Sequence, residues 1–347
     1  MLPQEVMKKA QAEFINWNNT GCSVMELSHR SKEYIEVYEQ AIASVSKLLN
    51  LPDDYSVLFM HGGGRGQFSA VPMNLLNGGQ ANYITTGSWS NSAVDEAKKF
   101  GEIQQQNVVK LQDGIKTVDP MAQWNVGSQS QYIHYCPNET VDGIEIFEQP
   151  SFSVPVVADM SSTILSRKID INNYDLIYAG AQKNIGPSGL SIVIIKKSLL
   201  AKSPNNIPSI FNYQLTDAKD SMFNTPPTYA IYLAKLVFDW LLAKGGVDAI
   251  EQQNIAKAEL LYNAIDNSSF YSNTVAIDNR SRMNVPFYLA NEDINDVFLN
   301  KAKDSGLLAL KGHRIVGGMR ASIYNAMPVS GVTALVDFMK EFERTHG

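Results

Sequence analysis

Two short apolar runs, joined by a glycine-rich stretch, constrain the fold of this chain more than any other feature of its sequence. Residues 175–179 read DLIYA, residues 190–195 read LSIVII, and the stretch between them contains three glycines. Short apolar runs bounded by glycine are typical of buried strands. About ten residues join the two runs, too few for the helical crossover of a parallel pair. The pattern therefore predicts two antiparallel strands linked by a turn.

Lys183 lies at the tip of this predicted turn, in a stretch that carries no other charge. A lysine between buried strands can be desolvated, and its neutral amine can then form a Schiff base. The alternative is a lysine that extends from a surface loop into water, which is the commoner case for a single lysine. Upstream, Asp159 ends another buried run, VPVVAD (154–159). An acid in that place can keep a pyridinium nitrogen protonated, so the two residues form the pair that a pyridoxal 5′-phosphate (PLP) enzyme needs.

A run of glycines follows the strand predicted over residues 55–60 and precedes a helix predicted over residues 68–76. Glycines at a helix N-terminus present backbone N–H groups to an anion, and the helix dipole favours negative charge there. The run HGGGRGQ (61–67) is neither a Walker loop nor a GxGxxG motif, because Gln67 occupies the place of the third glycine. A small phosphate is thus favoured over a nucleotide, and the alternative is a flexible turn.

Six longer stretches, in a fixed order along nearly the whole chain, resemble the signature motifs of the phosphoserine aminotransferase family. They are HGGGRGQF (61–68), HYCPNETVDGI (134–144), ADMSSTILSR (158–167), YAGAQKNIGPSGL (178–190), SMFNTPPT (221–228) and GHRIVGGMRASIYNAM (312–327). The resemblance implies an α/β protein of PLP-dependent transferase fold type I. A large domain (1–250) would contain a mostly parallel seven-stranded sheet, and residues 251–347 would form a smaller α+β domain.

The resemblance also implies an activity. The chain would transfer an amino group between L-glutamate/2-oxoglutarate and 3-phosphoserine/3-phosphohydroxypyruvate in serine biosynthesis. A second activity, on a phosphohydroxythreonine precursor of PLP itself, is implied with it. Lys183 would hold PLP and move the proton between the substrate Cα and the cofactor's C4′, and Asp159 would keep the ring an electron sink.

Further cofactor contacts follow from the resemblance, residue by residue. Gly64 and Arg65 would hold the cofactor phosphate, and Trp89 would stack on the pyridine ring. Thr140 and Gln182 would also contact the cofactor. For Thr140 an ordinary turn that satisfies its own backbone is nearly as good an interpretation of the sequence. Asn224 and Thr225 would reach across a homodimer interface to the neighbour's PLP phosphate.

The arginines indicate an anionic substrate. The chain has eight of them, and four lie in glycine- or histidine-containing junctions rather than on amphipathic faces: Arg30, Arg65, Arg314 and Arg320. The guanidinium fork suits carboxylate and phosphate groups. By resemblance, Arg320 would bind the α-carboxylate, and the distal anion would be held by His29, Arg30, His313 and Arg314. From His29 and Arg30 alone, a simple surface turn is the favoured interpretation, and it is the resemblance that favours a substrate-binding role.

Composition excludes several other classes of protein. A net charge of −6 over 347 residues gives no basic surface for nucleic acid and no polybasic membrane patch. No run approaches about eighteen apolar residues, and no signal peptide is evident, so we expect no membrane span. Two cysteines without a CxxC motif favour the cytoplasm. The five histidines show no metal spacing, and no GxSxG motif suggests a hydrolase.

Two alternatives remain beside this interpretation. A cysteine desulfurase would need a mobile cysteine downstream of the lysine, whereas Cys22 and Cys136 both lie upstream of it. The other alternative is a protein of the same fold that has lost activity and serves as a binding module. The family usually begins with an additional run ending in Phe-Ser-x-Gly-Pro-Ala, whose serine contacts substrate, and this sequence begins at MLP. This difference predicts that substrate binding is weakened more than cofactor binding.

Apolar periodicity and glycine or proline punctuation predict the remaining elements. The helices are expected at residues 3–18, 31–50, 229–242, 247–268, 292–305 and 329–344, with another after Trp89. Strands are expected at residues 81–86, 132–136, 280–287, 307–310 and 316–324. Residues 101–130 are expected to form strand and loop, and residues 196–220 to form a loop.

Overall fold

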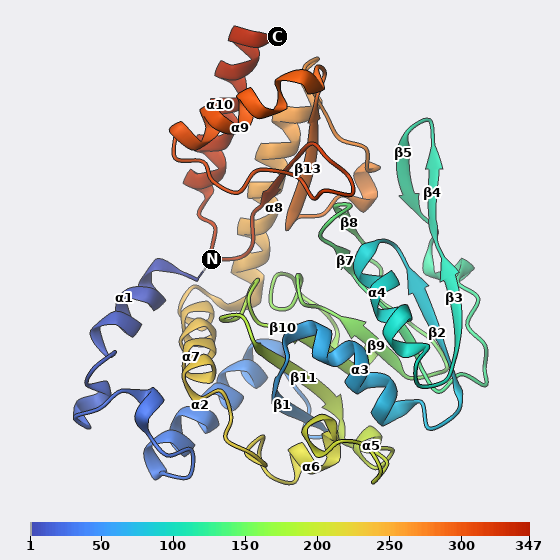
Figure 1. Ribbon diagram of the computed structural model, residues 1–347, viewed down its shortest axis with the longest axis vertical. Coiled ribbons are helices and arrows are strands. Elements are labelled where there is room, and N and C mark those ends of the chain that lie inside the picture. The colour runs from blue at the N-terminus through green and yellow to red at the C-terminus, as the bar shows by residue number, and fades with distance from the viewer. Residues whose placement is uncertain (1) are drawn as a thin grey trace.

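A seven-stranded sheet forms the centre of the computed structural model, which describes residues 2–347 (Figure 1). Its strand order is β1-β11-β10-β9-β6-β2-β3. The strands are β1 (Tyr55–His61), β2 (Gln80–Thr85), β3 (Glu102–Asn107), β6 (Ile133–Tyr135), β9 (Val156–Asp159), β10 (Leu176–Gly180) and β11 (Leu190–Lys196). Only β11 pairs antiparallel with its neighbours, and all other pairings in this sheet are parallel. The predictions of a mostly parallel seven-stranded sheet and of an antiparallel β10–β11 pair are confirmed.

Both faces of the sheet are buried at β1, β9, β10 and β11, which explains why these strands are largely apolar, whereas the edge strand β3 is polar and mostly exposed. Successive side chains of a strand point to opposite faces. Val57 and Phe59 of β1 accordingly lie in a first hydrophobic core, and Leu58 and Met60 lie in a second one. The first core is covered by α2 (Lys32–Leu49) and α7 (Thr228–Ala243), with α1 (Gln4–Ala12) packed against α7. The second is covered by α3 (Gly63–Leu75), α4 (Ser88–Ala97), α5 (Lys197–Leu200) and α6 (Tyr213–Asp217).

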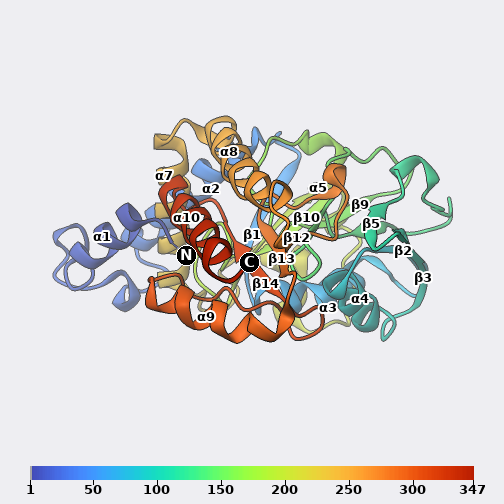
Figure 2. The ribbon, with the colours of Figure 1, turned by 90° about the horizontal axis from the view of Figure 1, so that it is seen from above.

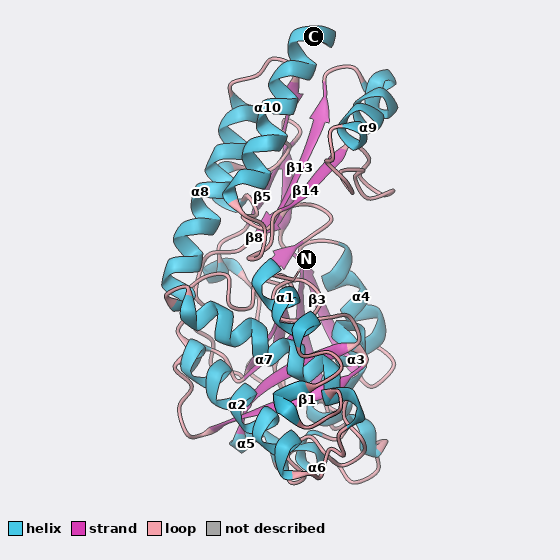
Figure 3. Ribbon diagram, turned by 90° about the vertical axis from the view of Figure 1, so that its left-hand side faces the viewer, coloured by secondary structure: helices cyan, strands magenta, loops and turns pink. Residues whose placement is uncertain are grey.

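A third core lies beyond the sheet and contains buried residues from Ala258 to Phe342. Its elements, which we call the C-terminal unit, surround a small antiparallel sheet in the order β12-β13-β14. They are α8 (Gly246–Asp266), β12 (Tyr271–Ser272), β13 (Asn284–Leu289), α9 (Asn295–Asp304), β14 (Met319–Ser322) and α10 (Val329–His346). Figure 3 shows α8 running from the level of α7 up to α10. This helix begins beside the first core, where Ile250 is buried, and ends in the third.

Two hairpins and one remote helix complete the arrangement. The hairpins are β4 (Val109–Gln112) with β5 (Ile115–Val118), and β7 (Asn138–Glu139) with β8 (Ile144–Glu145). Seen from above, α1 lies at the end of the molecule opposite to β2 and β3 (Figure 2). Short 3-10 turns cover Trp17–Asn19, Val24–Glu26, Met121–Gln123, Ile171–Asn173, Ser209–Phe211, Ile277–Asn279 and Glu292–Ile294.

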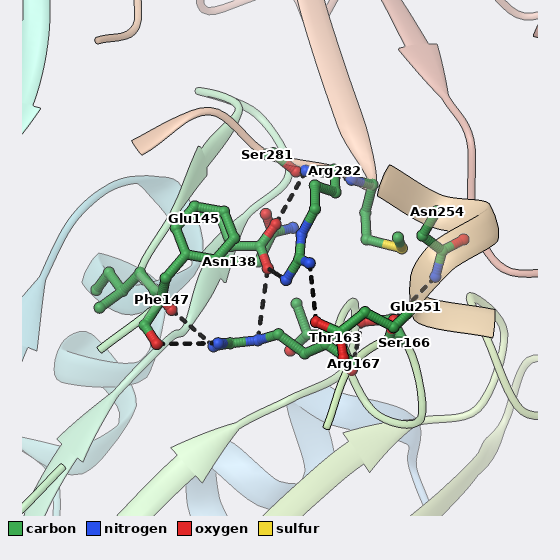
Figure 4. A network of polar contacts seen from close by, with 12 residues as sticks. Asn138, Glu145, Phe147, Thr163, Ser166, Arg167, Glu251, Asn254, Ser281 and Arg282 are labelled. Carbon is green, nitrogen blue, oxygen red and sulfur yellow. Dashed lines mark hydrogen bonds and ion pairs between the residues drawn. The ribbon is translucent and has the colours of Figure 1, made fainter. Parts of the chain in front are cut away.

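A buried ion network joins the sheet region to the C-terminal unit (Figure 4). The carboxylate of Glu145, which is 1% exposed, lies 3.5 Å from Arg167 and 3.0 Å from Arg282. Arg282 also contacts Glu251 of α8 at 3.1 Å. A buried carboxylate is tolerated only when it is paired and hydrogen-bonded, and this one is. The network holds the segment that leads into β13 against the hairpin β7–β8.

Several of the predicted elements differ from the structure, including the strands expected at 280–287 and 316–324, which are found at 284–289 and 319–322. The helix expected at 3–18 ends at Ala12, and Asn18 and Asn19 then adopt positive φ angles of 48° and 59°. The helix expected from residue 68 begins at Gly63. The strand expected at 307–310 is irregular because Ala309 has a φ of 60°, which no strand accommodates. The expected loop 196–220 contains the short helices α5 and α6.

Candidate active site

The carboxyl ends of five parallel strands meet at one edge of the large sheet. Because β1, β2, β6, β9 and β10 run in the same direction, the residues that follow them are brought together. Each of these strands is followed closely, or ended, by one residue singled out from the sequence: Gly64, Trp89, Thr140, Asp159 and Lys183. This edge is where open α/β sheets place their ligands.

A cradle of glycines stands at the end of β1, where α3 begins. Gly62 has a φ of 93° and its N–H donates to the carbonyl oxygen of Gly189 at 3.1 Å. A Cβ on Gly64 would lie 3.0 Å from Ser161 Oγ and 3.8 Å from the Gly180 backbone nitrogen. The close approach therefore favours glycine at this position. The first N–H groups of a helix have no intrahelical acceptors, so the cradle offers donors to an anion.

Asp159 ends β9 and lines the cavity beside the cradle. Its Oδ1 accepts hydrogen bonds from the Ser161 backbone nitrogen at 2.9 Å and from Ser161 Oγ at 2.6 Å. Ser161 Oγ in turn accepts from the Gly180 nitrogen at 2.9 Å, so this contact also links β9 to β10. Burial raises the pKa of the Asp159 carboxyl, while the charge of Lys183 and the hydrogen bonds from Ser161 oppose that rise. A positively charged group in the cavity would stabilise the ionised acid.

Lys183 stands in the turn that joins β10 to β11. The turn is closed by hydrogen bonds from the Ile185 and Gly186 nitrogens to the Ala181 carbonyl oxygen, at 3.1 and 2.8 Å. The Lys183 Nζ lies 5.6 Å from the centroid of the Trp89 ring. Its neighbour Asn184 donates to the Ser162 carbonyl oxygen at 3.0 Å. The turn is thus held on both sides of the lysine.

Trp89 forms one wall of the cavity and is held by the hairpin β7–β8. Its indole Nε1 donates to Thr140 Oγ1 at 2.8 Å. The guanidinium carbon of Arg65 lies 5.3 Å from the ring centroid, a cation–π distance. From the C-terminal unit, Arg320 Nη1 donates to the Thr140 carbonyl oxygen at 3.0 Å. Thr140 therefore links the tryptophan to an arginine of β14.

These groups enclose a cavity of about 300 Å³, within the range of small-molecule and cofactor sites. Its lining residues are Gly62, Gly63, Gly64, Arg65, Phe68, Trp89, Asn138, Asp159, Ser161, Ser162, Gln182, Lys183, Ser188 and Gly189. Six of the cofactor residues named from the sequence are among them: Gly64, Arg65, Trp89, Asp159, Gln182 and Lys183.

Other residues named from the sequence lie outside this lining. Thr140 and Arg320 are connected to it through hydrogen bonds, as described above. The other six are half-buried or exposed and do not line the cavity: His29, Arg30, His313, Arg314, Asn224 and Thr225. Asn224 instead lines a separate small cavity with His61, and its Nδ2 lies 3.5 Å from His61 Nε2.

Sequence reasoning missed several lining residues. Ser161 follows Asp159 by two residues, and a serine at that spacing commonly donates to the acid, so the signal was present. Asn138 stands two residues before Thr140, and its Nδ2 donates to Ser162 Oγ at 2.9 Å. Nothing in the local sequence predicts that contact, because it joins segments that only the sheet brings together. Phe68 was expected in a helix, and its place at the cavity follows from the earlier start of α3.

Two further features of residues 2–347 bear on the class of protein. No group of three or more His, Cys, Asp or Glu side chains in that range could hold a metal ion. None of its helices combines the length and the apolar character needed to cross a membrane.

Comparison with known proteins identifies the family. Residues 1–335 match the profile of the family "Aminotransferase class-V". The chain is 60% identical over 346 residues to the phosphoserine aminotransferase of Pseudoalteromonas translucida (strain TAC 125), covering 99% of this chain and 96% of that protein. The chain thus belongs to the class-V aminotransferases, in their phosphoserine aminotransferase branch, and the resemblance drawn from the six motifs is confirmed.

Solved structures agree with this assignment. The phosphoserine aminotransferase of Bacillus circulans subsp. alkalophilus superimposes with a TM-score of 0.95 at 42% identity, over 100% of this chain and 97% of that one. The PLP-bound phosphoserine aminotransferase of Trichomonas vaginalis gives a TM-score of 0.92 at 38% identity, over 98% and 97% of the two chains. The predicted fold class is confirmed by both.

Proposed function

We propose that this protein is a PLP-dependent aminotransferase that exchanges an amino group between L-glutamate and 3-phosphohydroxypyruvate, giving 2-oxoglutarate and 3-phosphoserine. One observation carries the proposal: Lys183, Asp159 and the glycine cradle line a single cavity in a chain that is 60% identical to a phosphoserine aminotransferase. The reaction belongs to serine biosynthesis. A second activity on a phosphohydroxythreonine substrate is part of the same proposal, because both substrates pair a phosphate with an α-amino or α-oxo acid.

The residues of the cavity fit PLP. The Trichomonas vaginalis relative is described as PLP-bound. In this chain the buried Asp159 lines the cavity, and burial raises its pKa. A protonated pyridine nitrogen is the cation that would stabilise its ionised form and lower that pKa. The N–H groups at the start of α3, together with Arg65, would hold the phosphate. Trp89 offers a flat ring to the pyridine, with Thr140 and Gln182 beside it.

When bound, PLP supplies an electron sink for the electrons that the substrate Cα–H bond releases. The chain supplies the groups that place the substrate and move its protons. Lys183 Nζ would hold PLP covalently, and its amine, when free, would accept the proton from the substrate Cα. Asp159 keeps the negative charge that favours a protonated ring nitrogen. Trp89 covers one face of the cavity and excludes water from it.

Five basic residues outside the cavity lining would bind the two anionic groups of each substrate. Arg320, which is hydrogen-bonded to Thr140, would hold the α-carboxylate. The distal carboxylate or phosphate would be held by His29, Arg30, His313 and Arg314. These four side chains are exposed or half-buried, so they can reach an anion that enters from solvent.

A homodimer is part of the proposal. Asn224 and Thr225 are exposed, as is Phe223 beside them at 46%. They stand in the segment between α6 and α7, away from the lining of their own cavity. Their role would be to reach the PLP phosphate of the partner subunit, so that each dimer contains two shared sites.

We also propose a division of the chain and a compartment. The large PLP-binding domain would span residues 1–250 and the small domain residues 251–347, which agrees with a first core that includes Ile250 and a third core that starts at Ala258. The cytoplasm suits the two free cysteines, Cys22 and Cys136.

The purified protein tests the proposal directly. It should show the visible absorbance of bound PLP, and borohydride should bleach that absorbance and fix the cofactor on the peptide that contains Lys183, as seen by mass spectrometry. With glutamate as donor, 3-phosphohydroxypyruvate should be a far better acceptor than pyruvate or glyoxylate. A cofactor fixed on another lysine, or a preference for pyruvate, would refute the assignment.

A further inference from the structure

Glu139 is a buried acid next to the cavity that the reaction described above leaves unused. It is 0% exposed and stands in β7, between Asn138 of the lining and Thr140. Its Oε1 accepts hydrogen bonds from the Ser90 backbone nitrogen at 2.7 Å and from Ser90 Oγ at 2.6 Å. Its Oε2 accepts from the Trp89 backbone nitrogen at 3.0 Å. Three donors of one short segment thus converge on a single carboxylate.

The carboxylate serves as the N-terminal cap of α4, although it comes from a segment some fifty residues further along the chain. Trp89 and Ser90 belong to the first turn of that helix, whose N–H groups otherwise have no intrahelical partner. Negative charge is favoured at a helix N-terminus, and hydrogen bonds to an ionised acceptor are about twice as strong as neutral ones. A Cβ on Gly87 would lie 2.8 Å from Glu139 Cδ, so the acid is packed tightly against the helix start.

No basic side chain in residues 2–347 forms an ion pair with Glu139. The neighbouring acid, Asp142, is instead paired with Lys116 at 2.6 Å. Burial raises the pKa of Glu139 to about 7, the hydrogen bonds from Ser90 and Trp89 oppose the rise, and Asp142 adds to it. The helix start is therefore the feature that stabilises the buried charge, and the charge in turn stabilises the helix start.

This cap holds Trp89 at both of its ends. The backbone nitrogen of Trp89 is bound by Glu139, and the indole nitrogen is bound by the hydroxyl of the next residue, Thr140. The Thr140 carbonyl oxygen accepts from Arg320. Two consecutive residues of β7 and its turn thus determine where the tryptophan ring lies and support the arginine of the C-terminal unit.

We infer that Glu139 is a positioning residue of the transamination: its carboxylate fixes the first turn of α4 and so holds the Trp89 ring at the orientation in which it covers the cofactor. The inference rests on the proposed function, in which Trp89 packs on the pyridine ring. Glu139 itself does not line the cavity, and it acts through Trp89.

The test compares Glu139→Gln with Glu139→Asp and with the control Glu96→Gln. Glu96 is on the same helix, pairs with Lys99 at 2.8 Å and accepts from Ser69 Oγ at 3.3 Å, and it makes no hydrogen bond to Trp89 or Ser90. For each protein we would measure visible circular dichroism per bound cofactor, the dissociation constant of PLP from the apoprotein, and the single-turnover rate with glutamate. Glutamine puts an N–H₂ group against one of the N–H donors. The rate of Glu139→Gln should fall by about tenfold to a hundredfold, with altered dichroism, while the aspartate variant recovers part of both and Glu96→Gln matches the wild type.

A double-mutant cycle separates positioning from a merely structural role. In a Trp89→Ala background there is no ring to orient, so adding Glu139→Gln should change the rate by less than about twofold. Full additivity of the two effects would overturn the inference. Unchanged dichroism and rate per bound cofactor, with only a lower melting temperature, would overturn it as well. If Glu139→Gln does not fold, Ser90→Ala serves as the second variant, because it removes one of the three donors. Its rate and dichroism should change in the same direction as expected for Glu139→Gln, but by less. A Ser90→Ala variant with unchanged rate and dichroism would count against the inference.

The outcome also distinguishes this inference from the proposed function. A wild-type protein that binds no PLP contradicts the proposed function. A wild-type protein that binds PLP and reacts with glutamate, beside a Glu139→Gln variant of identical dichroism and rate, contradicts the positioning role alone.

Discussion

Arg320 of β14 donates a hydrogen bond to the carbonyl oxygen of Thr140 at 3.0 Å, across the contact between the C-terminal unit and the sheet. The same threonine accepts from the indole of Trp89 through its hydroxyl. The proposed carboxylate-binding arginine is therefore connected to the wall of the cofactor cavity by one residue. A displacement of the C-terminal unit would change the distance between the substrate's carboxylate and its reacting carbon.

The proposed role of Lys183 gives the first prediction. Lys183→Ala should lower transamination by about 10²–10⁴-fold or more, because the described lining of the cavity contains no other amine to accept the Cα proton. The protein should lose the visible absorbance of covalently bound PLP while its far-ultraviolet circular dichroism stays unchanged. Lys168→Ala is the control, since that side chain is 71% exposed and pairs only with Asp248. Normal turnover by Lys183→Ala would show that the assignment of the lysine is wrong.

The proposed role of Asp159 gives the second prediction. Asp159→Asn should slow the single-turnover reaction with glutamate by roughly tenfold to a hundredfold, the loss of one charged hydrogen bond. Cofactor affinity should change much less, because the phosphate contacts are untouched. Asp175→Asn provides the control. Asp175 stands just before β10, at the edge of the sheet opposite to the cavity, and it pairs with Lys196. An equal loss of rate in both variants would refute a specific role for Asp159.

The glycine cradle at the start of α3 gives the third prediction. Gly64→Ala should weaken PLP binding by about tenfold, because the new Cβ would lie 3.0 Å from Ser161 Oγ, which cannot move without releasing Asp159. Gly127→Ala is a matched control, since its Cβ would meet its nearest neighbour, Ser130 Oγ, at an ordinary 3.6 Å. Titration of both apoproteins with PLP measures the difference. Equal affinities would mean that the cradle accommodates a side chain.

The proposed sharing of each site between two subunits gives the fourth prediction. Lys183→Ala and Asn224→Ala should each be nearly inactive as homodimers, the second through loss of cofactor. When the two variants are unfolded together and refolded, the hybrid dimer should contain one intact site, formed by the unaltered Lys183 of one subunit and the unaltered Asn224 of the other. Activity should therefore return on mixing. An activity of the mixture no greater than the sum of the activities of the two separate variants would contradict the shared site. So would a protein that sediments as a monomer and still holds PLP.

Lys257 of α8 gives the fifth prediction, which concerns how the stability of the fold depends on pH. It is 0% exposed, and its Nζ donates to the Ile323 and Tyr324 carbonyl oxygens at 2.8 Å each. Burial lowers its pKa from 10.5 to about 7. The unfolded chain therefore binds more protons than the folded one between these values, so this lysine makes stability rise with pH there, by up to about 1.4 kcal/mol per pH unit.

Lys257→Met removes that dependence. The difference in the free energy of unfolding, wild type minus variant, should grow in favour of the wild type from pH 7 to pH 9. Urea titrations at several pH values measure it, with the exposed Lys340→Met as control. A constant difference over this range would show that Lys257 does not titrate on folding.

Much of the fold was predictable because its signals are local. The apolar runs of β1, β9, β10 and β11 are buried on both faces, and such runs are short and continuous. Asp159 and Lys183 were found for the same reason, since each stands directly at the end of such a run. The glycines of α3 were misplaced in a loop because glycine is unfavourable inside helices. The close approach of Gly64 to Ser161 and of Gly66 to the His61 carbonyl oxygen explains two of them.

Other features depend on contacts between distant segments. The strand expected at 307–310 failed at Ala309, whose left-handed backbone has no sequence signal. Glu139 sits inside a recognised motif, yet its role as the cap of a helix some fifty residues away could not be read from that motif. The positions of Asn224 and Thr225 were named by resemblance, and their function stays a prediction.

The single antiparallel strand has a consequence for how the protein is made. Strand β1 pairs with β11, from Tyr55 with Lys196 to His61 with Leu190, and the Gly62 N–H bonds to Gly189. The glycine cradle is therefore incomplete until a strand synthesised much later has been inserted between β1 and β10. Pairings of such long range form slowly, and an emerging chain cannot make this one before residue 196 has left the ribosome. Capture of the cofactor should mark a late step of folding, so that the first appearance of colour reports a completed sheet.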